Sequence, residues 1–391
     1  MSDLASQIAD LARSLAPSSV RLRRDLHRHP ELSWTERRTT YRIAEALRDG
    51  GLEPVIRDDG IGLSVEVGSG GPLVGFRADI DALPIEEQTG APYRSLVDGV
   101  MHACGHDAHT AIAVGVAITL ASLDTMPGTA RILFQPSEED YPSGAQRLIE
   151  EGLVDGMAAI MAFHVDPTIP PGTVGLRAGP ITSAADRFHI RLTGPGGHTS
   201  RPERTVDLVR AASRMVLDLP DRVGAALPAG ANATLVFGRI TGGVAPNAIP
   251  TAVTASGTIR VRESETWRAL PALISRSVEE IVAPSGAGID VEFMPGVPPV
   301  DNDASVVAVI EDAAREVLDP GGVRSTAQSM GSEDFAWYLE HVPGALVRLG
   351  VGRDGEPVDL HSPTFDLDEA ALEHGIALAS LSLIRLMEQS R

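Results

Sequence analysis

Apolar residues recur along the chain with helical spacing in some segments and with strand spacing in others, which predicts an α/β fold. Helical spacing predicts two helices near the start, at 3–16 and 20–28, because Pro17 is expected to end the first of them. Strand spacing predicts buried strands at 62–68 and 72–80. The sequence GSGGP between these two strands is typical of a hairpin turn.

Three of the buried apolar runs each have an acidic residue or a histidine at or just after their C-terminal end. The side chains concerned are Asp79, Asp81, Glu138, Glu139 and His164. In an open parallel sheet the carboxyl ends of neighbouring strands meet at one end of the sheet, where binding sites form. We therefore expect these side chains to lie close together.

The spacing of apolar residues changes near residue 183 and returns to the earlier α/β pattern beyond residue 298. Between these positions the order strand, helix, strand, strand, helix, strand predicts a ferredoxin-like βαββαβ module. On either side the pattern is that of a mixed, mostly parallel sheet with helices. We therefore predict a larger α/β domain formed by 1–184 and 298–391, interrupted by an inserted domain at 185–297.

The composition excludes several classes of partner. A formal charge of −20 over 391 residues argues against binding to nucleic acid or to an anionic membrane. No apolar run reaches the roughly 18–20 residues needed to cross a bilayer. One cysteine allows no intrachain disulfide, and the N-terminal segment has no basic start followed by an apolar stretch. We therefore expect a cytoplasmic protein that acts on a small molecule.

The segment 101–110, MHACGHDAHT, holds the only cysteine and three histidines. Cys104 and His106 are two residues apart, so that both side chains can point into one cavity from a tight loop or from a strand end. The apolar run that follows predicts a buried helix. A buried thiol beside hydrogen-bonded histidines, or a cysteine nucleophile, is the alternative.

The candidate ligands favour a metal site. They are Cys104, His106, Glu139, His164 and His361, and each lies in a short polar break beside an apolar element. One zinc ion needs three or four protein ligands, whereas this set suits two divalent ions roughly 3.5–4 Å apart. Glu138 can then take a proton from the attacking water. Asp79 and Asp81 are expected to orient the ligating histidines or to cap turns.

The chain resembles the amidohydrolase branch of the M20 metallopeptidase family, which includes hippurate hydrolases, N-acyl-amino-acid deacylases and indole-acetyl-amino-acid hydrolases. The resemblance covers essentially the whole chain. It rests on ten segments in the expected order, namely RRDLHRHPELSWTE, FRADIDALPIEE, MHACGHDAHTA, FQPSEE, AFHVDP, GGHTSRPE, GGVAPNAIP, GTIR, MGSEDF and DLHSPTFDLDE. It implies a two-metal catalytic domain interrupted by a smaller lid or dimerisation domain.

The resemblance also implies a role for individual residues. The five candidate ligands match the metal ligands of the family, and Glu138 matches its general base. His198 matches a lid histidine that stabilises the oxyanion and that reaches the site from a neighbouring subunit in related enzymes. Asn247 and Arg260 match lid positions suited to the carbonyl and the carboxylate of the substrate. A homodimer or a higher homo-oligomer is implied.

We therefore expect a metal-dependent amidohydrolase that cleaves an N-acyl amino acid, with two divalent ions of Mn, Zn, Co or Ni. A di- or tripeptidase or a carboxypeptidase of the same family is the first alternative. A non-enzymatic binding module is the second, although every ligand and the base are present. Departures from the commoner family pattern, among them FQPSEEDYPSGA and Glu203, concern the surroundings of the substrate rather than the metal ligands.

Overall fold

The computed structural model describes residues 2–231, 233–355 and 357–391. The chain divides into two compact units. The larger unit consists of Met1–Gly179, Asn302–Ala327 and Trp337–Arg391, and the smaller unit consists of Pro180–Asp301 and Gln328–Ala336. The segment 328–336 therefore clusters with the smaller unit, although it follows the predicted return to the larger domain.

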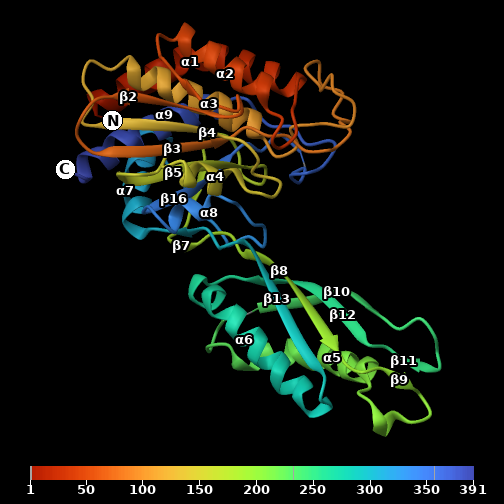
Figure 1. Ribbon diagram of the computed structural model, residues 1–391. Helices are drawn as coiled ribbons and strands as arrows, with labels where there is room; N and C mark the ends of the chain where they lie inside the picture. The colour runs from red at the N-terminus through yellow and green to blue at the C-terminus, as the bar shows by residue number, and fades with distance from the viewer. Residues whose placement is uncertain (1, 232, 356) are drawn as a thin grey trace. The chain divides into compact units, whose positions relative to one another are not determined.

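An eight-stranded mixed sheet forms the centre of the larger unit (Figure 1). In sheet order its strands are β1 (Val55–Ile56), β2 (Leu63–Gly68), β4 (Thr129–Gln135), β3 (Leu73–Asp79), β5 (Met157–Asp166), β16 (Gly344–Gly350), β6 (Val174–Leu176) and β15 (Val323–Ser325). β3 runs parallel to both β4 and β5, and β5 runs parallel to β16. The carboxyl ends of β4, β3 and β5 therefore lie side by side, as expected from the sequence.

Helices cover this sheet and bury the apolar core. They are α1 (Asp3–Arg28), α2 (Arg37–Asp49), α3 (His106–Ala121), α4 (Gly144–Glu150), α7 (Ala304–Val317), α8 (Ala336–Leu339) and α9 (Ala371–Gln389). α1, α3 and α9 pack against one another, and α7 packs against α9. α3 is buried around nearly its whole circumference, which its apolar sequence predicts. None of the described helices is long and apolar enough to cross a membrane.

The expected break at Pro17 is wrong, because α1 continues through this residue. A proline inside a helix leaves the carbonyl of the residue four positions earlier without its hydrogen bond. Here that residue is Arg13, and both Arg13 and Pro17 are exposed, so water can bind the unpaired carbonyl. The buried stripe on either side, with Ala12 and Leu22, keeps the helix packed on the core.

The expected hairpin between β2 and β3 is also wrong. β4 lies between them, and it pairs antiparallel with β2 and parallel with β3. The glycines of GSGGP do reverse the chain, since Gly70 and Gly71 have φ angles of 65° and 63°. Turn composition predicts the reversal but does not decide which strands become neighbours.

The smaller unit has the βαββαβ order predicted from the sequence. Its elements are β8 (Ala184–Thr193), α5 (Leu208–Ala226), β10 (Ala233–Gly242), β12 (Ala252–Val261), α6 (Ser264–Val282) and β13 (Gly288–Val297). The antiparallel sheet has the order β10-β12-β8-β13, and α5 and α6 pack on it (Figure 1). The short strands β9 (Gly197–His198) and β11 (Ala248–Ile249) pair separately.

Four further elements are short. β7 (Gly179–Pro180) and β14 (Asp301–Asn302) lie where the chain passes from one unit to the other, and the 3₁₀ turns are η1 (Pro202–Arg204) and η2 (Ala283–Ser285). The separate apolar core of the smaller unit is formed by β8, β12, α5 and α6, with Phe188 and Ile274 fully buried. Each unit therefore has a core of its own.

Candidate metal centre

A sharp turn between Cys104 and His106 places both side chains at the start of α3. The residue between them, Gly105, has a φ angle of 82° and precedes the first helical residue, His106. A Cβ atom at this position would lie 2.6 Å from Cγ2 of Val165. Only glycine fits this turn, because it tolerates both the positive φ angle and the close approach of β5.

The structure brings Cys104 together with the candidate ligands from β5, from the loop after β4 and from the segment before α9. The Cys104 Sγ atom lies 3.3 Å from Nε2 of His361 and 3.6 Å from Nε2 of His164. The His361 Nε2 atom lies 3.1 Å from Oε1 of Glu139. These residues are as many as 257 positions apart in the sequence, and the sheet topology is what makes them neighbours.

Two of the histidines have one ring nitrogen held by the backbone. Nδ1 of His106 is 3.0 Å from the carbonyl oxygen of Asp81, and Nδ1 of His164 is 2.8 Å from the carbonyl oxygen of Val165. A hydrogen bond to a carbonyl fixes the proton on Nδ1 and leaves the lone pair on Nε2. Nε2 of His106 is buried and has no hydrogen-bond partner among the described residues.

Glu138 and Glu139 both face His106. Its Nε2 atom lies 4.0 Å from Oε2 of Glu138 and 3.9 Å from Oε1 of Glu139. Ligand atoms of Cys104, Glu139 and His361 lie within 4.8 Å of one another, and those of His106, Glu138 and Glu139 do so as well. A sulfur, nitrogen and oxygen donor set with a buried lone pair fits divalent first-row metal ions.

Asp79 and Asp81 lie behind the histidines and are completely buried. Asp79 binds Arg77 at 2.7 Å and Nδ1 of His109 at 2.6 Å, while Oδ1 of Asp81 lies 3.2 Å from Nδ1 of His106. Burial alone would raise the pKa of both carboxyl groups, but the facing histidines, and Arg77 beside Asp79, lower both pKa values. Both aspartates are therefore charged, and Asp79 contacts the ring of His109 while Asp81 contacts that of His106.

Three histidines near the site have surroundings that the sequence did not reveal. Nε2 of His109 accepts the backbone N–H of Val165 at 3.0 Å, which ties α3 to β5. Burial lowers the pKa of His102 to about 4. His27 on α1 has its Nδ1 atom 2.8 Å from Oδ2 of Asp107, the second residue of α3. A histidine that reaches a distant helix leaves no local pattern in the sequence.

The predicted residues of the smaller unit lie on two different sheets. His198 is exposed on β9, and its Nδ1 atom accepts the backbone N–H of Ser200 at 3.0 Å. Asn247 precedes β11, and its carbonyl oxygen accepts the N–H of Thr199 at 3.2 Å. Arg260 lies on β12 of the four-stranded sheet. The structure therefore brings the segments of His198 and Asn247 together, while Arg260 belongs to another element.

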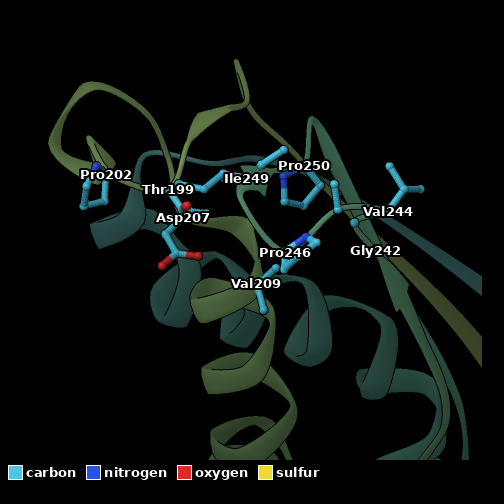
Figure 2. A pocket seen from close by; sticks show the side chains of 12 residues that line it. Thr199, Pro202, Asp207, Val209, Gly242, Val244, Pro246, Ile249 and Pro250 are labelled. Atoms are coloured by element: carbon cyan, nitrogen blue, oxygen red, sulfur yellow. The ribbon is translucent and has the colours of Figure 1, made fainter.

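A pocket of about 600 Å³ lies beside the His198 and Asn247 segments (Figure 2). It opens between the loop that precedes α5 and the loop that joins β10 to β11. The residues that line it are Thr199, Pro202, Asp207, Val209, Gly242, Gly243, Val244, Ala245, Pro246, Ala248, Ile249 and Pro250. Thr199 follows His198 directly, and Pro246 and Ala248 flank Asn247, so the pocket borders both segments, although neither His198 nor Asn247 is among its lining residues.

Comparison with known proteins identifies related sequences along nearly the whole chain. The sequence profile of the family described as Peptidase family M20/M25/M40 matches residues 75–384. The N-acetyl-L-cysteine deacetylase of Bacillus subtilis (strain 168) is 39% identical over 366 residues, which cover 92% of this chain and 86% of that protein. Relatives named thermostable carboxypeptidase and IAA-amino acid hydrolase also match.

One relative is considerably longer than this chain. A protein of Rhodococcus jostii (strain RHA1) with the provisional name glutamate–cysteine ligase 2-3 is 42% identical over 373 residues. The match covers 95% of this chain and 47% of that protein, so the chain spans about half of its length.

A solved structure agrees with the fold over both units. The crystal structure of a Bacillus subtilis protein described as a dinuclear metal-binding peptidase of the M20 family matches with a TM-score of 0.84 at 34% identity. The match covers 96% of this chain and 99% of that one. The chain belongs to the peptidase family M20/M25/M40 and is a metal-binding enzyme that acts on amide bonds.

Proposed function

We propose that this enzyme hydrolyses the amide bond of an N-acyl amino acid to a carboxylate and a free amino acid. The observation that supports this proposal is the convergence of Cys104, His106, Glu139 and His361 around one place, with Glu138 at its side. Deacetylases of N-acetylcysteine and hydrolases of IAA-amino acids among the relatives support the same substrate class.

The proposed metal ligands are Cys104, His106, Glu139, His164 and His361. When bound, two divalent ions supply Lewis acidity, which polarises the substrate carbonyl and acidifies the attacking water. Burial and the charge of Glu139 raise the pKa of the Cys104 thiol, so a metal ion bound there would have to displace the thiol proton. Metal binding therefore releases protons.

Glu138 is the proposed general base. Its side chain is largely buried, and it faces His106. A carboxylate in this position removes a proton from the attacking water and later gives it to the leaving amine. The adjacent Glu139 donates its backbone N–H to Oδ2 of Asp81 at 3.0 Å, which fixes the loop that carries both glutamates.

His198 is the proposed donor to the oxyanion that develops on the acyl oxygen. Its Nδ1 atom accepts a backbone N–H, which places the proton on Nε2, where it can be donated. Asn247 is proposed to bind the substrate carbonyl, and Arg260 is proposed to bind the carboxylate of the leaving amino acid through a charge-assisted contact.

The experiment that tests this proposal combines elemental analysis with hydrolysis assays. We expect about two metal ions per chain, loss of activity on chelation, and recovery with Mn²⁺, Zn²⁺, Co²⁺ or Ni²⁺. The substrates are N-acetyl and N-benzoyl amino acids. A chain that binds no metal, and that hydrolyses none of these amides with any added ion, would contradict the proposal and favour a binding module.

A peptidase is the second candidate, because thermostable carboxypeptidases are among the relatives. The two activities differ in whether a free amino group on the substrate is needed. We therefore include dipeptides and tripeptides in the same assay, matched in their C-terminal residue to the N-acyl amino acids. A kcat/KM that is higher for the free peptides would favour the peptidase.

We also propose that the enzyme is a homodimer or a higher homo-oligomer, and that His198 acts in the active site of the neighbouring subunit. β10 is an edge strand of the four-stranded sheet, and it exposes the apolar side chains of Val236 and Ile240. The neighbouring helix α5 exposes Val209 and Leu217. An apolar sheet edge without a partner strand is a surface suited to association.

Mixing two inactive variants tests this arrangement. A mixed dimer of Glu138→Gln and His198→Ala subunits holds one complete active site only if His198 acts across the interface. After exchange of subunits we expect about a quarter of the wild-type activity, because half of the dimers are mixed and each has one complete site. No recovery, although co-purification of two differently tagged subunits shows that mixed dimers have formed, would place His198 in its own subunit.

A further inference from the structure

Three non-glycine residues in the described part of the chain have a positive φ angle, and they are Trp34, Ser137 and His361. A left-handed conformation is unfavourable for such residues, and it persists only where the surrounding structure enforces it. Ser137 directly precedes Glu138, and His361 is a proposed metal ligand. Trp34 lies far from both in the sequence, in the loop before α2. Its positive φ angle therefore needs a separate explanation.

Trp34 and its neighbours contact the loop that carries the two glutamates. We use the name brace for residues 33–36. Nε1 of Trp34 donates to the carbonyl oxygen of Pro142 at 2.9 Å, beyond the glutamates. Oγ of Ser33 donates to Oδ2 of Asp81 at 2.8 Å, and this same carboxylate oxygen accepts the backbone N–H of Glu139. The brace therefore reaches the loop directly at Pro142 and indirectly through Asp81.

Glu36 makes the third and most direct contact. Its side chain is completely buried, and its Oε1 atom accepts the backbone N–H of Ser137 at 2.8 Å. Oε2 is also buried and has no hydrogen-bond partner in the described ranges. The bond holds the N–H of a residue with a φ angle of 49°, one position before the proposed base.

The position of Glu36 at the start of α2 offers a simpler role, but another residue fills that role. An acid just before a helix usually accepts the first N–H groups of that helix. In this chain Glu31 does so, because its carboxylate accepts the N–H groups of Arg38 and Thr39 at 3.1 and 2.8 Å. Glu36 makes no side-chain bond to its own helix and turns to Ser137 instead.

We propose that Glu36 is a positioning residue of the amide hydrolase: through its bond to the N–H of Ser137 it holds the strained backbone that aims Glu138. This inference rests on the proposed function, in which Glu138 is the base. Burial and the charge of Asp81 raise the pKa of Glu36 to about 8, so at neutral pH the group is mainly a neutral acid that accepts a hydrogen bond. A glutamine has the same shape and the same acceptor oxygen.

The test compares Glu36→Gln with Glu36→Met. Both replacements have nearly the volume of glutamate, but only glutamine can accept the N–H of Ser137. For Glu36→Met we expect kcat to fall about 10–100-fold with KM and metal content unchanged, since a base that is displaced by a fraction of an ångström loses that much rate. Glu36→Gln is expected to restore kcat to within about threefold of the wild type.

A second readout does not depend on activity or on bound metal. Hydrogen–deuterium exchange of the metal-free protein reports on the amides of residues 134–143. We expect Glu36→Met to exchange faster than the wild type in this segment, and Glu36→Gln to exchange as the wild type does. The control is Glu31→Met, which removes an acceptor from the end of α2. It should lower the melting temperature and leave kcat per metal-loaded enzyme unchanged.

Each outcome supports or overturns the inference. If the wild type is active and Glu36→Met is equally active, the proposed role of Glu36 is overturned and the proposed function stands. Equal losses in Glu36→Gln and Glu36→Met would also overturn it, because the hydrogen bond would then not be what matters. A Glu36→Met variant that loses its metal ions together with its activity would assign Glu36 to the metal site instead. A wild type without amidase activity would overturn both this inference and the proposed function.

Discussion

The metal centre of the larger unit and the His198 segment of the smaller unit differ in how firmly their side chains are held. Asp79, Asp81 and His106 are completely buried, and further buried groups fix each of them. His198 and the loop around it are exposed and are held by a two-residue strand pair and backbone bonds. The proposed ligands of the larger unit are therefore held in place by buried groups, whereas the proposed oxyanion donor of the smaller unit is exposed and held only locally.

The largest effect is expected for the proposed base, Glu138, in the larger unit. For Glu138→Gln we expect kcat to fall about 10³–10⁴-fold, because the variant has no carboxylate to accept the proton of the attacking water. Metal content and melting temperature should remain those of the wild type, since glutamine has the same shape. Steady-state kinetics and elemental analysis check this. A variant with more than a tenth of the wild-type kcat would assign the proton transfer to another group.

The second-largest effect is expected for His198, in the exposed segment of the smaller unit. His198→Ala should lower kcat about 10²–10³-fold, the loss that follows removal of one donor to an oxyanion. Its melting temperature should be unchanged, because the side chain buries little surface. His189→Ala on β8 of the same unit is the control for a general loss of activity on replacing a histidine. If His198→Ala and His189→Ala had the same kcat, His198 would not be the donor to the oxyanion.

A smaller effect, on metal affinity, is expected for Asp81, which contacts the proposed ligand His106. Asp81→Asn keeps the shape of the side chain but removes the charge that orients His106, so we expect metal affinity to fall about 10–100-fold. Competition with a chromophoric chelator measures the affinity. Asp312→Asn, an exposed residue of α7, is the matched control. Unchanged affinity in Asp81→Asn would mean that the backbone carbonyl alone holds His106.

The smallest effect concerns stability rather than activity. Burial opposes a charge on His27, but Asp107 raises its pKa from 6.5 to about 8. A raised pKa in the folded state stabilises the fold fully below pH 6.5, and this contribution is lost as the pH rises through about 8. The wild type should therefore lose about 2 kcal/mol more than His27→Gln between pH 6 and pH 9. Urea unfolding at both pH values measures the difference, and parallel pH profiles would contradict it.

The sequence predicts that the candidate metal-centre side chains converge, because they lie at strand ends or before a helix. Strand ends that are parallel neighbours meet in space, so the positions of Asp79 and Glu139 along the chain already indicate that they converge. The succession of strand and helix spacing predicts the βαββαβ order of the smaller unit. Which amide the enzyme cleaves is not contained in these patterns, because apolar spacing reports secondary structure and burial rather than the shape of a binding pocket.

The incorrect and missing predictions have physical causes of two kinds. Pro17 does not end α1, because tertiary packing on both sides outweighs the local preference and water binds the freed carbonyl. The role of Glu36 is missed because its partner Ser137 is 101 positions away. Locally Glu36 looks like a residue that caps a helix, and only the structure reveals that Glu31 has taken that place.

The 257 positions between Cys104 and His361 also determine when the centre can form during synthesis. The first four proposed ligands are made with the first half of the chain, and His361 follows only after the whole smaller unit and β16. Its backbone N–H then binds the carbonyl oxygen of Ala103, next to Cys104. A growing chain therefore holds an incomplete set of the proposed ligands for most of its synthesis, and the proposed site can be complete only after His361 has been made.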